Sequence, residues 1–243
     1  MLSHFIFDVD GTLTPSRQRI DHEFASYFYS LCDRHKVYLV SGSDYAKTVE
    51  QLGEKIVNKV ETVYSCSGSD VWKQGKNIRT SHWQLPTDCE DWLRQELNNS
   101  LFPLRTGNHI EKRPGAVNFS IVGRGATLGE RKLYVEWDEK YNERELLAHN
   151  FNTLFENSSY AVVAKIGGET GLDISPVGCD KSQILVDFNK ENDFIVFFGD
   201  KMEEGGNDFP LADTLFKSYQ GSNYKVDGWK YTWELLKKYV EMV

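Results

Sequence analysis

The sequence predicts an α/β protein in which both ends of the chain build one parallel sheet wound with helices, and a mixed α+β segment is inserted between them. Over about 65 residues from the N-terminus, short apolar runs alternate with amphipathic stretches. The same alternation returns near the C-terminus, whereas the middle of the chain follows a different pattern. We therefore expect a discontinuous core of residues 1–81 and 181–243 and a second domain of residues 82–180.

The N-terminal elements follow from their hydrophobic period. Phe24, Phe28 and Leu31 recur at positions i, i+4 and i+7, which is one face of an amphipathic helix. A second helix is predicted for residues 43–56, with Ser43 as its N-cap. The first helix is expected over residues 21–32, and strands over residues 3–8, 36–41 and 62–67.

The remaining elements are predicted in the same way. Residues 116–123 alternate apolar and polar side chains, with Asn118 and Ser120 on the polar face, as a half-buried strand does. Helices are expected over residues 87–102, 143–157, 181–188 and 229–242, and strands over residues 160–166, 171–176 and 193–200.

Composition excludes several classes of function. The net charge of −8 over 243 residues argues against nucleic-acid or membrane binding driven by charge alone. The four cysteines form no CxxC pair, which predicts free thiols in a reducing compartment. The chain has neither an apolar run of about 18 residues nor a signal-peptide pattern. We expect a cytoplasmic protein that binds neither nucleic acid nor a membrane.

Polar residues gather where the predicted strands end. Asp8 and Asp10 follow the first strand, Ser41 and Ser43 follow the second, and Asp200 ends the apolar strand near the C-terminus. In a parallel sheet these ends lie on one edge, where α/β proteins bind their ligands. Crowded carboxylates repel one another unless a cation lies among them, and hard oxygen ligands favour Mg²⁺. A magnesium site is therefore expected at this edge.

The spacing of the first two acids has a further meaning. Residues i and i+2 of an extended segment point to the same side, so Asp8 and Asp10 can flank one substrate atom. One can attack while the other transfers a proton. The alternative is an Asx-turn that closes the strand, shaped by Gly11 and Thr12.

A second acidic cluster follows the late apolar strand. In "FFGDKMEEGGNDF", Gly205 and Gly206 form a tight loop that opens a helix. From this loop Asn207 and Asp208 can reach back to a metal ion or to its bound waters. Taken alone, the same four residues also form an ordinary turn.

Together these residues resemble the haloacid dehalogenase-like superfamily of phosphotransferases. Its signature is DxDGT, then Ser or Thr, then Lys at a helix start, then GD…ND, and all four occur here in order. The resemblance implies that Asp8 is the nucleophile, Asp10 the general acid/base, and Lys181 a neutralising cation. It implies that Ser41 or Ser43 binds the transferring phosphoryl group. It also implies that Mg²⁺ is held by the Asp8 side chain, the Asp10 carbonyl and Asp200, with Asn207 or Asp208 in support.

A closer resemblance is to the eukaryotic-type phosphomannomutases. It is carried by "FDVDGTLTPSRQRI", "SGSDYAKTVEQLG", "GRGATLGER", "DISPVGCDKSQ" and "FFGDKMEEGGNDF". It implies a Rossmann-like core with an inserted α+β cap that closes over the substrate, and a homodimer formed through the caps. The implied reaction interconverts mannose 6-phosphate and mannose 1-phosphate for GDP-mannose synthesis, with a hexose 1,6-bisphosphate as activator. The implied substrate-binding residues are Arg17, Ser43, Arg113, Arg124, Arg131, Gly171 and Asp173.

The chain departs from the family pattern at a few positions. The family usually has serine where this chain has Gly171, an Asn-Gly pair where this chain has Ser67-Gly68, and glycine where it has Ser41. These differences concern the choice between mannose and glucose phosphates more than the reaction class.

Three other classes of function are alternatives to this one. A magnesium-dependent sugar-phosphate phosphatase of the same superfamily would also form an aspartyl-phosphate in its first step. In the second step it would admit water, whereas a mutase delivers a sugar hydroxyl. A dinucleotide fingerprint is disfavoured, because "GRGATLG" has the spacing GxGxxxG. A non-catalytic binding protein is disfavoured, because Asp8, Asp10, Lys181 and Asp200 are all present.

Overall fold

The computed structural model describes residues 2–16, 18–218 and 220–240, so Arg17 lies outside the described residues. The chain divides into two compact units. Unit 1 comprises the described residues up to Thr80 together with those from Gly178 onward, and unit 2 comprises Ser81–Val177. No helix among the described residues has the length and apolar character that crossing a bilayer requires.

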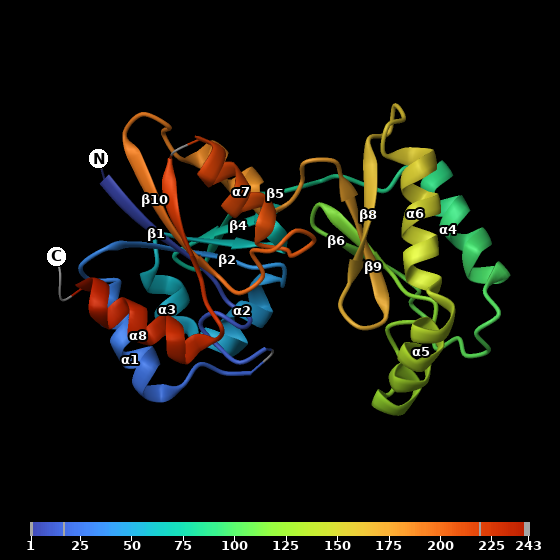
Figure 1. Cartoon of the computed structure of the whole chain (residues 1–243), viewed down its shortest axis with the longest axis horizontal. Helices are drawn as coiled ribbons and strands as arrows, with labels where there is room; N and C mark the ends of the chain where they lie inside the picture. The colour runs from blue at the N-terminus through green and yellow to red at the C-terminus, as the bar shows by residue number, and fades with distance from the viewer. Residues whose placement is uncertain (1, 17, 219, 241–243) are drawn as a thin grey trace. The chain divides into compact units, whose positions relative to one another are not determined.

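Unit 1 is built on a seven-stranded sheet with the order β11-β10-β1-β2-β3-β4-β5. The first five strands in this order are parallel, and β4 and β5 continue the sheet antiparallel. In Figure 1, β1 and β10 lie side by side although they come from opposite ends of the chain. The bounds are β1 Leu2–Asp8, β2 Lys36–Val40, β3 Thr62–Ser65, β4 Asp70–Lys73, β5 Lys76–Thr80, β10 Asp193–Gly199 and β11 Gly221–Lys225. The predicted α/β class with a parallel sheet is confirmed.

The helices of unit 1 correct three details of the prediction. Asp44, and not Ser43, caps α2, because the Asp44 carboxylate accepts the backbone N–H of Lys47 at 2.8 Å. The single helix expected over residues 43–56 is broken at Gly53, whose φ is +82°. The helix expected after Lys181 is the 3₁₀ helix η2. The bounds are α1 His22–Leu31, α2 Tyr45–Leu52, α3 Glu54–Lys59, η1 Cys66–Gly68, η2 Lys181–Asp187, α7 Phe209–Ser218 and α8 Trp229–Val240.

Both faces of this sheet are covered at its centre, which explains why β1 and β10 contain continuous apolar runs. Phe7 and Phe198 point to the face that packs against α1, α3 and α8. Ile6 and Phe197, their neighbours in sequence, point to the opposite face, which packs against η2 and α7. The Phe7 ring stacks on Phe198 at 4.8 Å and meets the edge of Phe28 at 5.1 Å.

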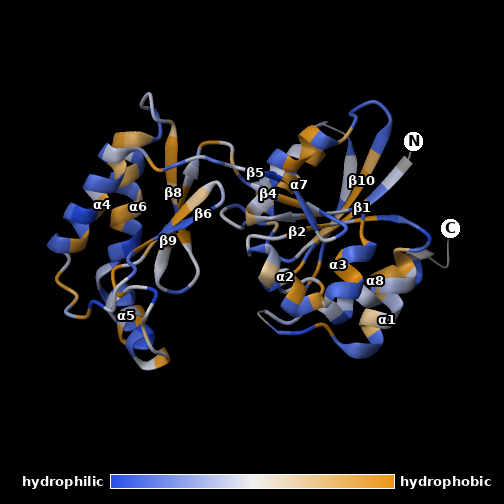
Figure 2. Cartoon of the chain, turned by 180° about the vertical axis from the view of Figure 1, so that it is seen from behind, coloured by the Kyte–Doolittle hydropathy of each residue, from blue (hydrophilic) through white to orange (hydrophobic). Residues whose placement is uncertain are grey.

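Unit 2 is a four-stranded antiparallel sheet with the order β6-β7-β9-β8, packed against three helices. Figure 2 shows a hydrophobic β8 and a largely hydrophilic outer surface on α4. The bounds are α4 Thr87–Asn99, β6 Ile110–Arg113, β7 Ala116–Phe119, α5 Leu128–Tyr141, α6 Glu143–Phe155, β8 Val162–Gly167 and β9 Gly171–Pro176. Helix α5 was not expected, although a capping box between Thr127 and Glu130 marks its start.

The half-buried strand expected over residues 116–123 is wrong in two respects, because β7 ends at Phe119 and its polar positions are buried. Val117 and Phe119 are buried as predicted, but Asn118 and Ser120 are also buried, at 3% and 1% exposure. The Asn118 amide donates to the Asp173 carboxylate at 2.7 Å, and the Ser120 hydroxyl donates to the Thr170 carbonyl at 2.9 Å. The Asn118 NH₂ group and the Ser120 hydroxyl are therefore paired although they are buried, whereas Oδ1 of Asn118 has no partner among the described residues.

The aromatic packing in unit 1 predicts that alanine substitutions at two phenylalanines differ strongly in their effect on stability. Phe28 is fully buried, and Phe28→Ala is expected to lower the free energy of unfolding by about 3–5 kcal/mol, because it leaves a cavity beside Phe7. Phe216 is 72% exposed, so Phe216→Ala should change it by less than about 0.5 kcal/mol. Urea denaturation of both variants measures the difference, and equal effects would contradict the packing described here.

Candidate active site

Three strand ends of unit 1 meet at one edge of the sheet. Asp8 is the last residue of β1, and β1 lies between β2 and β10, which end just before Ser41 and Asp200. After Asp8 the chain turns sharply, because the backbone N–H groups of Thr12, Leu13 and Thr14 all donate to the carbonyl of Val9. The convergence of these strand ends, predicted from the sequence, is confirmed.

Three carboxylates converge at this edge. Asp8, Asp200 and Asp208 each offer an oxygen, and these oxygens lie within 4.8 Å of one another. Gly11, at φ +83°, makes room for the cluster, since a Cβ on it would lie 2.3 Å from Oδ2 of Asp200. Oδ2 of Asp8 is buried and has no hydrogen-bond partner among the described residues. A buried oxygen without a partner beside two further carboxylates fits the requirements of a divalent cation.

Lys181 is fully buried between two of these acids. Its Nζ donates to Oδ1 of Asp8 at 2.5 Å and to Oδ1 of Asp208 at 2.6 Å. The other oxygen of Asp208 accepts the backbone N–H of Lys201 at 3.0 Å. Asp208 therefore anchors Lys181, and Lys181 in turn orients Asp8.

Burial and crowding set the protonation of this cluster. Burial raises the pKa of Asp8 to about 7; Lys181 opposes this shift, and Asp208 and Asp200 add to it. Burial also raises the pKa of Asp200, with Asp208 adding to the effect. Burial alone would lower the pKa of Lys181, but Asp8 and Asp208 raise it above its usual value. The ammonium stays charged, and the carboxylates favour a further cation.

Asp10 and Asn207 lie differently from the three converging acids. Strand β1 ends at Asp8, so the extended i, i+2 geometry does not continue to Asp10. The half-buried Asp10 accepts a hydrogen bond from Nε2 of Gln51 at 2.9 Å. Asn207 is exposed, next to the buried Asp208. Neither side chain belongs to the group of three.

The loop after β2 distinguishes its two serines. Ser41 is 1% exposed, and its Oγ accepts the backbone N–H of Ser43 at 3.0 Å. The carbonyls of Ser41 and Ser43 accept the N–H groups of Ser67 and Cys66, both at 2.8 Å. Ser41 thus shapes the loop from within, and Ser43 is the half-buried member.

In unit 2, two of the predicted arginines share one carboxylate. Nε of Arg113 lies 2.9 Å from Oε2 of Glu111, and Nε of Arg124 lies 3.3 Å from the same oxygen. Nη1 of Arg113 also lies 3.8 Å from Oδ1 of Asp173. The structure therefore brings Arg113, Arg124 and Asp173 together around Glu111, which the sequence did not single out.

Strand register explains this grouping. Glu111 pairs with Asn118, Asn118 with Asp173, and Asp173 with Lys165, so the four residues form one row across the sheet. Directly paired residues share a face of an antiparallel sheet. Glu111, Asn118 and Lys165 were missed because membership of the row depends on strand pairing, for which the sequence contains no local signal.

Arg131 and Gly171 occupy other positions in unit 2. Nη2 of Arg131, on α5, lies 3.4 Å from Oε2 of Glu169, and its buried Nε has no partner among the described residues. Gly171 begins β9 where a Cβ would lie 2.9 Å from the Asn118 amide nitrogen. A serine here would displace Asn118, which accounts for glycine at this position.

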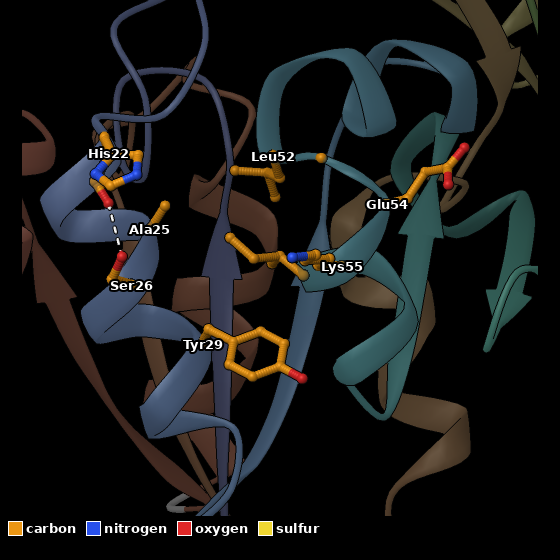
Figure 3. A pocket seen from close by; sticks show the side chains of 9 residues that line it. His22, Ala25, Ser26, Tyr29, Leu52, Glu54 and Lys55 are labelled. Carbon is orange, nitrogen blue, oxygen red and sulfur yellow. Dashed lines mark hydrogen bonds between the residues drawn. The ribbon is translucent and has the colours of Figure 1, made fainter.

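A separate pocket of about 700 Å³ lies between α1 and the junction of α2 and α3 (Figure 3). Its walls include Tyr29, Leu52 and Lys55, and the Ser26 hydroxyl donates to the carbonyl of His22 beside it at 3.0 Å. None of the converging carboxylates lines it, so it is distinct from the candidate active site.

Comparison with known proteins agrees with this geometry. The eukaryotic phosphomannomutase family model matches residues 24–241, a segment that contains Lys181, Asp200 and Asp208 and begins after Asp8 and Asp10. The chain is 35% identical to phosphomannomutase 1 of Mus musculus over 217 residues, which is 85% of this chain and 81% of that protein. It is 31% identical to the phosphomannomutase of Saccharomyces cerevisiae over 219 residues, covering 85% and 83%.

The fold is also found in a solved structure. A haloacid dehalogenase-like hydrolase from Bacteroides thetaiotaomicron aligns with a TM-score of 0.61 at 13% sequence identity, covering 98% of this chain and 100% of the other. The chain therefore has a haloacid dehalogenase-like fold and belongs to the eukaryotic phosphomannomutase family.

Proposed function

We propose that the protein is a phosphomannomutase that interconverts mannose 6-phosphate and mannose 1-phosphate through an aspartyl-phosphate on Asp8. The observation that carries this proposal is the buried Asp8, held by Lys181 through one oxygen while its other oxygen has no partner among the described residues. A carboxylate held in this way presents a defined oxygen to an incoming phosphorus atom.

The converging acids are the proposed metal site. Asp8 and Asp200 would hold Mg²⁺ together with the Asp10 carbonyl, and Asn207 and Asp208 would support it. When bound, Mg²⁺ would offset the negative charge that otherwise keeps a carboxylate and a phosphate apart. Asp208 also fixes Lys181 at 2.6 Å, which aims the ammonium at the same carboxylate.

Two more groups act on the transferring phosphoryl group. The Ser43 hydroxyl donates a hydrogen bond to one of its oxygens, in a loop that Ser41 shapes from within. Asp10 is the general acid/base, and Gln51 orients its carboxylate through a hydrogen bond at 2.9 Å. Phosphoryl transfer depends mainly on positioning and charge, so a hydroxyl and a carboxylate held in fixed positions can assist it.

Unit 2, Ser81–Val177, is the proposed substrate-binding cap, for which the sequence predicted residues 82–180. Arg113, Arg124 and Arg131, together with Arg17 of the core, would bind the phosphate that is not being transferred, because a guanidinium binds phosphate through two hydrogen bonds. Asp173 would accept from a sugar hydroxyl, and the backbone at Gly171 would border the sugar.

The cellular role follows from the family. A hexose 1,6-bisphosphate would prime the enzyme by phosphorylating Asp8, and mannose 1-phosphate would serve GDP-mannose synthesis. We propose a cytoplasmic homodimer formed through the caps.

A sugar-phosphate phosphatase is the second candidate, because it would use the same Asp8 and Lys181. The two reactions part when the aspartyl-phosphate is resolved, by a sugar hydroxyl in a mutase and by water in a phosphatase. The arginine group around Glu111 favours the mutase, since a mutase must bind both ends of a bisphosphate.

Product analysis tests the proposed reaction. The protein, incubated with mannose 1-phosphate, Mg²⁺ and a trace of a hexose 1,6-bisphosphate, is expected to form mannose 6-phosphate without matching release of inorganic phosphate. A chelator should abolish the conversion, and added Mg²⁺ should restore it. Release of one phosphate per sugar consumed would assign the chain to the phosphatases.

The nucleophile is tested by Asp8→Asn. An amide cannot attack phosphorus, so kcat is expected to fall on the order of 10⁴-fold. The fold should persist, because Lys181 keeps Asp208 as a partner. Asp33→Asn is the control, since Asp33 is exposed and pairs with Lys59 at the surface. Turnover that survives Asp8→Asn would reassign the nucleophile.

The arginine group is tested by Arg124→Ala. Loss of a charged hydrogen-bond donor to phosphate is expected to raise KM for mannose 1-phosphate by about 10- to 100-fold. Arg94→Ala is the matched control, because Arg94 is exposed on α4 of the same unit and contacts Glu90. Unchanged KM in Arg124→Ala would remove this residue from the substrate site.

A further inference from the structure

The short helix η1 has an unusual backbone. It lies next to residues 41–44, the loop after β2 that we call the serine loop. Cys66, Ser67 and Gly68 follow one another with φ values of +48°, +57° and +99°. Only glycine adopts this region readily, so two of the three residues are held in a conformation that the surroundings must impose. In this conformation the N–H groups of Cys66 and Ser67 reach the carbonyls of Ser43 and Ser41.

Gln183, on η2, holds this loop from the other side. Its Nε2 donates to the carbonyl of Ser67 at 2.8 Å and contacts Oγ of Ser69 at 3.3 Å. The two segments pack closely, since a Cβ on Gly68 would lie 2.8 Å from Ile184 and 3.0 Å from Gln183. The Gln183 amide therefore bonds to the loop whose N–H groups support Ser41 and Ser43.

Gln183 also lies two residues after Lys181 on the same short helix. One continuous series of hydrogen bonds thus leads from η2, which carries the ammonium, through Ser67 to the loop that carries the Ser43 hydroxyl. Lys181 itself is fixed to Asp8. Gln183 therefore joins the helix that carries the Lys181 ammonium to the segment that holds Ser41 and Ser43.

We propose that Gln183 is a positioning residue that aligns Lys181 and Ser43 on the transferring phosphoryl group. Its side chain donates to the Ser67 carbonyl, and it acts through this contact. The inference rests on the proposed function, because it assigns Lys181 and Ser43 to one phosphoryl group.

A second contact of η2 provides the control. Asp187, at the far end of this helix, accepts from Nη1 and Nη2 of Arg79 on β5 at 2.9 and 2.7 Å. This pair ties η2 to the sheet without contacting the serine loop. If Gln183 merely tethers η2, removing either contact should have the same consequences.

The experiment compares Gln183→Met, which keeps the side-chain length but removes the donor, with Asp187→Asn in the full-length protein. For Gln183→Met, kcat with mannose 1-phosphate is expected to fall about 10- to 100-fold with KM within about twofold. Binding of orthovanadate in the presence of Mg²⁺, measured by calorimetry, should weaken in parallel. Asp187→Asn should leave kcat and orthovanadate affinity within about twofold of the wild type, although its Tm falls.

The outcomes separate the two proposals. Wild-type kcat and orthovanadate affinity in Gln183→Met, or an equal loss in Asp187→Asn, would overturn the role of Gln183. Gln183→Glu, which also cannot donate to the Ser67 carbonyl when ionised, repeats the test if the methionine variant does not fold. A wild-type protein without mutase activity would refute the proposed function, while orthovanadate binding by the variants would still test Gln183.

Discussion

The buried group formed by Lys181, Asp8 and Asp208 is the interaction on which the rest of unit 1 depends. It joins η2, the end of β1 and the loop before α7, which are far apart in the chain. With Asp200 nearby, three carboxylates and one ammonium leave two negative charges when all are ionised. A divalent cation would balance this charge. Removing Lys181 alone would leave two buried acids without a counter-ion, which costs about 3–5 kcal/mol in comparable buried pairs.

The same constraint explains the local chemistry of the surrounding chain. Gly11 is required because any side chain would overlap the Asp200 carboxylate, and Asp208 must be buried to hold Lys181. Asp8, Lys181 and Asp208 are all buried at the base of the site. The low dielectric strengthens each charge pair and makes an unpaired charge costly. Substitutions that change the charge of a side chain in the site are therefore expected to be destabilising.

Much of the fold and part of the site could be predicted from the sequence. Asp8, Ser41 and Asp200 follow strands that are apolar over most of their length, so the strand signal and the site signal coincide. Edge strands such as β5, "KNIRT", and β11, "GSNYK", are polar and leave no such pattern. Glu111 and Gln183 depend on strand register and on long-range packing, neither of which has a local periodicity. The family resemblance supplied Arg113 and Arg124, but their shared partner Glu111 was found only in the structure.

The discontinuity of unit 1 has a consequence for folding during synthesis. Residues 81–177, which form unit 2, are made in full before β10 is translated. Until then the central strand β1 has a neighbour on one side only, and Phe5 and Phe7 lack part of the packing that covers them in the finished protein. Such an exposed, apolar strand edge invites aggregation in the nascent chain. The core can therefore close only when the residues from Gly178 onward have emerged from the ribosome.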